Sequence, residues 1–124
     1  MANKVGILIE YDFEDAELVY PYYRMQEAGF TPVLIGPKAG VQYKGKHGYP
    51  MTSNTSSSDV NARDLLALII PGGWAPDRMR RDQKLVMLVK EMDAEGKSFL
   101  SVQHIATSRL LSSLWMLYCG AIFT

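Results

Sequence analysis

Residues that could do chemistry follow three separate apolar runs of the chain. A carboxylate can orient a neighbouring group or accept its proton, paired glycines can bring backbone N–H groups close to an anion, and an imidazole can carry a proton near neutral pH. The three runs therefore place different chemical groups at their ends. These groups are Glu14 after residues 4–10, Gly72 and Gly73 after residues 65–71, and Gln103 and His104 after residues 98–102.

Each of these groups also has an ordinary structural interpretation. Glu14 could be a glutamate of a helix N-terminus that faces water and interacts with the helix dipole. The Gly72-Gly73 pair could form a tight turn that binds nothing. His104 could be structural, and Gln103 has neither a titratable proton nor a useful nucleophile. A basic cluster after the glycines is typical of a solvated surface; it consists of Arg78, Arg80 and Arg81.

Strands must position these groups, and the sequence predicts several of them. Four short apolar runs indicate strands that are covered on both faces, as in a parallel sheet. Residues 41–51 alternate in polarity and turn at Gly45 and Gly48, which predicts a hairpin. Residues 52–64 are polar and rich in turn-forming residues. The four predicted buried strands are 4–10, 31–37, 65–73 (stopped by Pro71 and the two glycines) and 98–102.

One predicted helix follows the first strand. Asp12 is a candidate N-cap, and the carboxylates after it suit the positive end of a helix dipole. Pro21 predicts a kink or a late start, because an interior proline removes a helix hydrogen bond. Gly29 is expected to end this helix.

A second helix is predicted for residues 82–96, and a less regular pattern suggests a third at residues 104–118. In the second helix Asp82 can cap the N-terminus and Gly96 can end the helix. Its apolar residues recur at helical spacing and predict one buried face; they are Leu85, Leu88, Val89 and Met92.

Strands that alternate with helices predict an α/β domain with a doubly wound, mostly parallel sheet. In such sheets, sites lie beyond the carboxyl ends of the strands. We therefore expect three segments to converge at one edge: Tyr11–Glu14, Pro71–Pro76 and Val102–His104.

Composition limits the class of protein. The chain has 124 residues, which fits a single domain over 1–124, and its 13 basic and 13 acidic side chains give no signal for nucleic acid or a membrane surface. Cys119 is the one cysteine, so no internal disulfide is possible. The N-terminus has no features of a secretory signal, and we expect a cytoplasmic protein. No glycine-rich phosphate-binding motif and no metal-ligand spacing occurs, so we expect neither cofactor nor metal.

Three stretches of the sequence together resemble the DJ-1/PfpI superfamily, within it the intracellular-protease-like PfpI and general stress protein branch. They are KVGILIEYDFEDAELVYPYYRMQEAGF, GKHGYP and LALIIPGGWAPDRMRRDQKLVMLVKEMDAEGK, and the resemblance covers residues 4–97. It implies a flavodoxin-like α/β fold, similar to class I glutamine-amidotransferase domains, in a dimer or hexamer. It also implies peptidase, glyoxalase or deglycase activity on peptides or small carbonyl adducts, and a role in stress protection.

The resemblance assigns roles to individual residues. Glu14 matches the glutamate that hydrogen-bonds to the family's reactive cysteine, and Gly73 matches the oxyanion-hole glycine. Asp77 matches the acidic residue that a neighbouring subunit supplies, one methylene shorter than the usual glutamate. His104 matches the histidine after the cysteine, and Gln103 occupies the position of the cysteine itself. The family's covalent chemistry should therefore be impaired in this chain.

The resemblance ends near residue 98. The tail 98–124 departs from the family pattern, and the chain stops before the last strands and helix that the family implies, so the fold should be incomplete at its C-terminus. The tail belongs either to a short, diverged relative or to an altered reading of the gene. An impaired hydrolase is one interpretation of function, and a non-catalytic stress-associated protein that binds partners or forms oligomers is the alternative. A flavin or nucleotide binder has the fold class as its only support.

Overall fold

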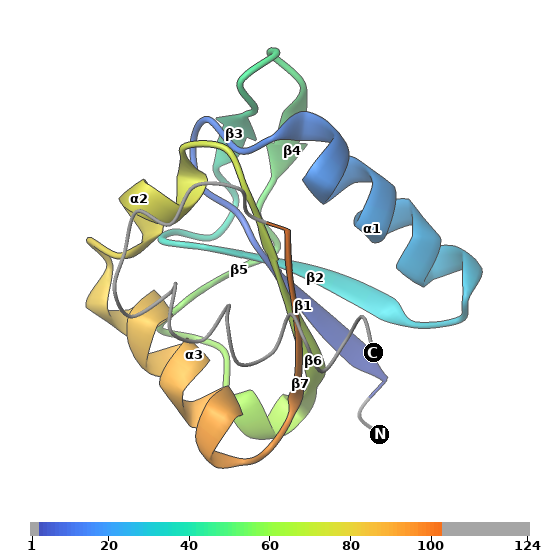
Figure 1. Ribbon diagram of the computed structural model, residues 1–124, viewed down its shortest axis with the longest axis vertical. Coiled ribbons are helices and arrows are strands. Elements are labelled where there is room, and N and C mark those ends of the chain that lie inside the picture. Colours follow the sequence, from blue (N-terminus) through green and yellow to red (C-terminus); the bar gives the residue numbers. More distant parts are fainter. Residues whose placement is uncertain (1–2, 103–124) are drawn as a thin grey trace.

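A computed structural model of the chain describes residues 3–102, without the side chains of Pro76 and of residues 98–102. Its centre is a parallel sheet with strand order β5-β2-β1-β6-β7 (Figure 1). This order and the helices on both sides define the flavodoxin-like doubly wound fold that was expected. The strands are β1 (Lys4–Leu8), β2 (Thr31–Gly36), β5 (Thr55–Ser56), β6 (Leu65–Pro71) and β7 (Ser98–Val102).

All four predicted strands are present, and the apolar runs of β1, β2 and β6 build the core. Ile7 of β1 and Leu68 of β6 are completely buried, as is Ile35 of β2. Gly6 keeps this core tight, because a Cβ there would lie 2.9 Å from Ile35 Cδ1 and 3.0 Å from Leu68 Cδ1. Continuous apolar runs are required here because helices cover both faces of a parallel sheet.

Two long helices cover opposite faces of the sheet (Figure 1). They are α1 (Asp15–Glu27) and α3 (Gln83–Ala94). The prediction for α3 is confirmed: the Asp82 carboxylate accepts a hydrogen bond from the Lys84 N–H at 3.0 Å, and Gly96 follows the helix with φ +68°. The four residues predicted for its apolar face, Leu85, Leu88, Val89 and Met92, are all buried.

Helix α1 differs from the prediction at its start. Glu14, not Asp12, is the N-cap residue, and the Glu14 side chain makes no capping hydrogen bond. Asp12 instead has φ +64°, in the left-handed region, and belongs to the loop before the helix. The predicted late start is wrong, since α1 begins six residues before Pro21 and contains it. Gly29, with φ +89°, follows the last turn as predicted.

The segments between the strands hold the predicted hairpin and three short elements that the sequence did not reveal. The hairpin pairs antiparallel strands β3 (Gln42–Lys44) and β4 (Pro50–Thr52). Strand β5 has only two residues, and Asn54 attaches it to β2 through two hydrogen bonds with the Leu34 backbone, both 2.8 Å. Such short elements carry no periodicity of their own. The other two are the 3₁₀ turn η1 (Ala62–Asp64) and helix α2 (Ala75–Met79).

The carboxyl ends of the parallel strands meet at one edge of the sheet, together with the hairpin and α2 (Figure 1). The predicted helix at 104–118 lies outside the described residues. Within residues 3–102, no helix is long and apolar enough to cross a membrane.

Candidate functional site

Two of the three segments expected at the carboxyl edge are joined there by backbone hydrogen bonds. The Glu14 N–H donates to the Gly72 carbonyl at 3.1 Å, and the Trp74 N–H donates to the Asp12 carbonyl at 2.9 Å. Phe13 and Gly73 form an isolated antiparallel bridge between these bonds. The predicted convergence of the loops after β1 and β6 is therefore confirmed.

Gly73 occupies a position that requires glycine. Its φ is +79°, and a Cβ there would lie 2.7 Å from both the Asp12 carbonyl oxygen and the Glu14 nitrogen. Both the backbone conformation and the close approach of the loop exclude a larger residue. The glycine pair therefore forms a turn that is clamped to the residues that precede α1.

The backbone amide of Gly72 is already occupied. It donates at 2.8 Å to Oε1 of Glu17, a residue of the first turn of α1. An incoming anion would have to displace this carboxylate to reach the Gly72 N–H. Of the N–H groups of the glycine pair, that of Gly72 is therefore not an unused donor.

The side chain of Glu14 is turned toward the hairpin and is not a freely solvated helix-terminal glutamate. It is 22% exposed, with Oε2 at 3.1 Å from Lys46 Nζ and Oε1 at 3.3 Å from His47 Nε2. Both partners belong to the turn between β3 and β4. Glu14 is thus a carboxylate held between an ammonium group and an imidazole, able to orient or exchange a proton with a group placed against it.

Asp15 positions the hairpin turn that carries these partners. Its two carboxylate oxygens accept hydrogen bonds from the backbone N–H groups of His47 at 3.0 Å and Tyr49 at 2.9 Å. The Lys46 N–H also donates to the Phe13 carbonyl at 2.8 Å. Consecutive residues therefore have separate tasks: Asp15 fixes the turn, and Glu14 contacts the side chains that the turn presents.

The sequence pattern does not indicate Lys46, His47 or Asp15 as site residues. The available signal was the stretch GKHGYP, in which two glycines flank a pair of basic residues at a hairpin tip. A tip of this kind is exposed in most proteins, and its position over the carboxyl edge depends on contacts between residues more than thirty positions apart. Local pattern could not supply that information.

Asp77 lies on α2, close to the glycine turn. Its side chain is 26% exposed, and Oδ1 lies 2.8 Å from Nη2 of Arg80. This oxygen is buried, and Arg80 approaches it with ion-pair distance but without hydrogen-bond geometry. Asp77 is therefore held within its own chain among the described residues, and its expected role toward a second subunit stays a prediction.

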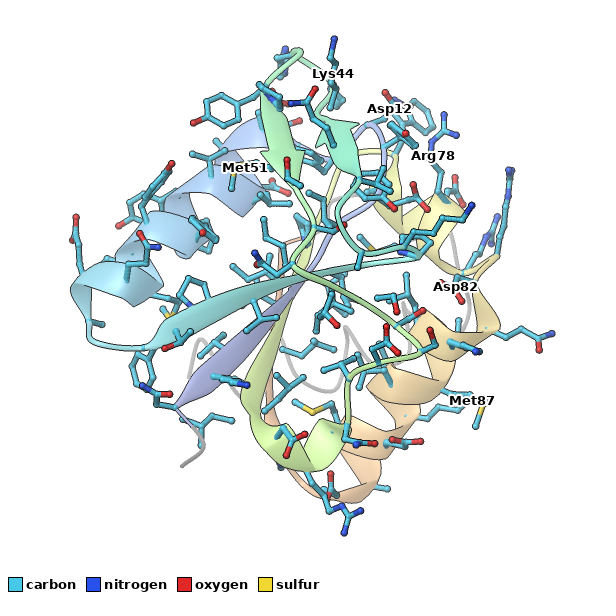
Figure 2. All side chains as sticks on the ribbon, turned by 180° about the vertical axis from the view of Figure 1, so that it is seen from behind. Asp12, Lys44, Met51, Arg78, Asp82 and Met87 are labelled. Atoms are coloured by element: carbon cyan, nitrogen blue, oxygen red, sulfur yellow. The ribbon has the colours of Figure 1, made fainter. Side chains whose placement is uncertain are left out.

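Arg78 ties α2 to the loop after β1. Its Nη2 lies 2.7 Å from Oδ2 of Asp12, and the two side chains are close together at the sheet edge (Figure 2). The arginine cluster is thus only partly a solvated surface, because Arg78 and Arg80 each pair with a carboxylate.

Gln103 and His104 lie outside the described residues. Strand β7 leads to them, and its last residue, Val102, pairs in register with Pro71, directly before the glycine turn. The assignment of the cysteine position to Gln103 and of the following histidine to His104 stays a prediction from the resemblance.

The family model of the DJ-1/PfpI family matches residues 3–114, and the chain belongs to this family. It is similar to a deglycase of Pyrococcus abyssi, with 42% identity over 101 residues, 82% of this chain and 60% of that protein. It is also similar to the deglycase PfpI of Pyrococcus furiosus, 38% identical over 82% of this chain and 60% of that protein. General stress protein 18 of Bacillus subtilis is 35% identical over 84% of this chain and 61% of that protein.

A solved structure agrees with this assignment. A two-domain protein of Anabaena variabilis, with DJ-1/ThiJ/PfpI-like and ferritin-like domains, matches with a TM-score of 0.79 and 38% identity. The match covers 82% of this chain and 29% of that one. Because this chain spans about three fifths of the length of the curated relatives, it corresponds to only part of their domain.

Proposed function

We propose that this chain carries an impaired form of the active site of a cysteine-dependent hydrolase, of the peptidase, glyoxalase or deglycase type. Substrates of this site would be peptides or small carbonyl adducts of the kind that deglycases remove. The names of the relatives from Pyrococcus support the deglycase class among these activities.

The placement of Glu14 carries this proposal. Its backbone N–H is bonded to Gly72, and its half-buried carboxylate is fixed by Lys46 and His47 at the edge toward which β7 leads. The resemblance gives this glutamate the role of hydrogen-bonding to the reactive residue, and a fixed carboxylate suits that role. Gly73 would support the oxyanion, and Asp77 would complete a neighbouring subunit's site in a dimer or hexamer.

Gln103 is the reason for proposing impairment. An amide side chain cannot form the covalent intermediate that a thiolate forms, and loss of a catalytic nucleophile costs on the order of 10⁴-fold in rate. The second candidate is a non-catalytic protein of the cytoplasm that binds partners or self-associates under stress. Gln103 favours this candidate too, because it leaves the site without a nucleophile.

The test restores the missing nucleophile. Gln103→Cys is made together with Cys119→Ser, so that the new cysteine is the sole thiol, and is compared with Cys119→Ser alone. We expect the new thiol to be alkylated by iodoacetamide faster than free cysteine, because a reactive thiol is one with a lowered pKa. Consumption of methylglyoxal should rise by about 100-fold or more over the parent.

A third variant adds Glu14→Gln to this pair of substitutions and should lose most of the gained turnover. Methylglyoxal turnover in the parent equal to that of the cysteine variant would contradict the proposed impairment. An unreactive thiol with no gain in turnover, in protein whose circular dichroism matches the parent, would favour the non-catalytic alternative.

A further inference from the structure

An open depression of about 430 Å³ lies at the carboxyl edge of the sheet, apart from the contacts of Glu14. It is bounded by the ends of β1 and β2 and by the corner between α2 and α3. Arg78 and Asp82 lie on this same side of the molecule (Figure 2). Its lining residues are Glu10, Pro37, Arg78, Arg81 and Asp82, so four of the five carry a charge.

Two of these charged groups already have partners. Arg78 pairs with Asp12 at 2.7 Å. The Asp82 carboxylate accepts one hydrogen bond from the Lys84 N–H at 3.0 Å and another from the Ser57 hydroxyl at 2.9 Å. Arg78 and Asp82 therefore form fixed walls of the depression. The charged groups that remain available to a ligand are those of Glu10 and Arg81.

Glu10 offers a carboxylate with unused capacity. Its Oε1 accepts a hydrogen bond from the Tyr11 N–H at 2.8 Å, and within residues 3–102 the other oxygen has no hydrogen bond or ion pair. The side chain is half-buried, and this burial raises its pKa, although the charge of Arg78 acts in the opposite direction. A partly desolvated carboxylate gains most from a cationic hydrogen-bond donor.

Arg81 offers the opposite charge. It is exposed, and in the described part of the chain its guanidinium makes neither a hydrogen bond nor an ion pair. A guanidinium presents paired donors that match the two oxygens of a carboxylate. The depression therefore presents one unpaired negative and one unpaired positive group.

We propose that this depression binds a small α-amino acid in its zwitterionic form. The ammonium group would donate to Glu10, and the carboxylate would accept from Arg81. A phosphate-rich ligand fits less well, because the carboxylates of Glu10 and Asp82 would repel it. A simple cation fits less well because Arg81 faces the same space. The proposal does not depend on the activity of the Glu14 site.

The ligand test uses the complete chain and three probes that differ in charge. L-alanine carries both charges, propionate carries only the carboxylate, and ethylamine carries only the ammonium group. Titrations followed by the backbone amide signals of Tyr11 and Asp82 should saturate with L-alanine. Propionate and ethylamine should each bind at least about tenfold more weakly than L-alanine, since each lacks one charge-assisted hydrogen bond.

Two near-isosteric substitutions test the two ends of the site. Glu10→Gln and Arg81→Gln should each weaken L-alanine binding about tenfold. The matched controls Glu27→Gln and Arg24→Gln change exposed residues of α1 and should leave the affinity unchanged.

Equal affinity for propionate and L-alanine would overturn the proposal in favour of a plain anion site, and equal affinity for ethylamine would reduce it to a cation site. The absence of any saturable shift with L-alanine would reject it outright. Because the probe series is run on the unmodified protein, these outcomes hold even where a substitution impairs folding.

Discussion

Two glutamates four residues apart, in the segment after β1, have opposite environments. Glu14 lies between Lys46 and His47 of the hairpin turn. Glu10 accepts a hydrogen bond from its neighbour's backbone and lies in a depression walled by the α2–α3 corner. The first carboxylate has an ammonium group and an imidazole supplied from within the chain, whereas the second has no ion pair within residues 3–102.

This difference shows that the segment after β1 contributes a carboxylate to each of two separate places at one edge of the sheet. The backbone of residues 12–14 is bonded to residues 72–74, which fixes Glu14 relative to this turn, whereas the Glu10 carboxylate accepts its hydrogen bond from Tyr11. What distinguishes them is which distant element faces each side chain. A hairpin with two basic residues faces Glu14, whereas the α2–α3 corner gives Glu10 no ion-pair partner among the described residues.

Gly73→Ala should have the largest effect, because it breaks the close approach between the glycine turn and the backbone of Asp12 and Glu14. The new Cβ would lie 2.7 Å from Asp12 and Glu14 backbone atoms in a residue with φ +79°. We expect a loss of roughly 2 to 4 kcal/mol of unfolding free energy, measured by urea denaturation.

Gly40→Ala is the matched control. Gly40 has a similar φ of +70°, but a Cβ there would have no atom within 4 Å among the described residues. It should cost about 1 kcal/mol from backbone conformation alone. If the two variants were equally stable, the close approach at Gly73 would contribute nothing to the loss of unfolding free energy in Gly73→Ala.

Asp15→Ala should have an intermediate effect and should separate the two glutamates. It removes the two carboxylate acceptors of the His47 and Tyr49 N–H groups, so His47 loses its fixed position against Glu14, while Lys46 keeps its backbone bond to Phe13. We expect a loss of about 1 to 2 kcal/mol in urea denaturation. The amide signals of His47 and Tyr49 should shift, while that of Tyr11, beside Glu10, should not.

Asp64→Ala serves as the control for this substitution, since Asp64 is exposed in η1. It should leave both the stability and the hairpin signals unchanged. Equal shifts at Tyr11 and Tyr49 in Asp15→Ala would show that the two glutamate environments are coupled rather than separate.

Glu10→Gln should have the smallest effect, and a stabilising one. Burial raises the pKa of Glu10 above the usual 4.5, so the folded state holds this proton more tightly than the unfolded state. Stability of the unmodified chain should therefore fall as pH rises from 4.5 through the folded-state pKa of Glu10. The variant escapes this loss, and its gain should be less than about 1 kcal/mol at neutral pH.

This gain should vanish below pH 4.5, where the carboxyl group is protonated in both states. Melting temperatures measured from pH 3.5 to 7.5 for Glu10→Gln, the parent and the exposed-site control Glu27→Gln test the prediction. A gain that stays constant over this whole range would show that burial of the charge is not its cause.

Much of the scaffold was predictable because its signals are local. Continuous apolar runs predicted the buried strands, and the spacing from Leu85 to Met92 predicted α3 with its buried face. The start of α1 was mispredicted, because Asp12 has the residue type of an N-cap but a left-handed φ of +64° imposed by its bonds to residues 44, 74 and 78. The helix propensity of a residue carries no information about such contacts with distant parts of the chain.

The candidate site was predictable only in outline. The sequence identified Glu14 and Gly73 and predicted that their loops meet. It did not identify Lys46, His47 or Asp15, since their contacts join residues about thirty positions apart. It also could not show that the Glu17 carboxylate occupies the N–H of Gly72.

By itself, the sequence determined the order of the four main strands, the hairpin and the two long helices, the family, and the presence of Gln103 where the resemblance expects a cysteine. These features follow from side-chain type and short-range periodicity, which any segment displays without its neighbours. The tertiary structure decided which groups each carboxylate faces and why residue 73 must be glycine. Those outcomes depend on distances between segments far apart in the chain, and only packing of the sheet, hairpin and α2 sets them.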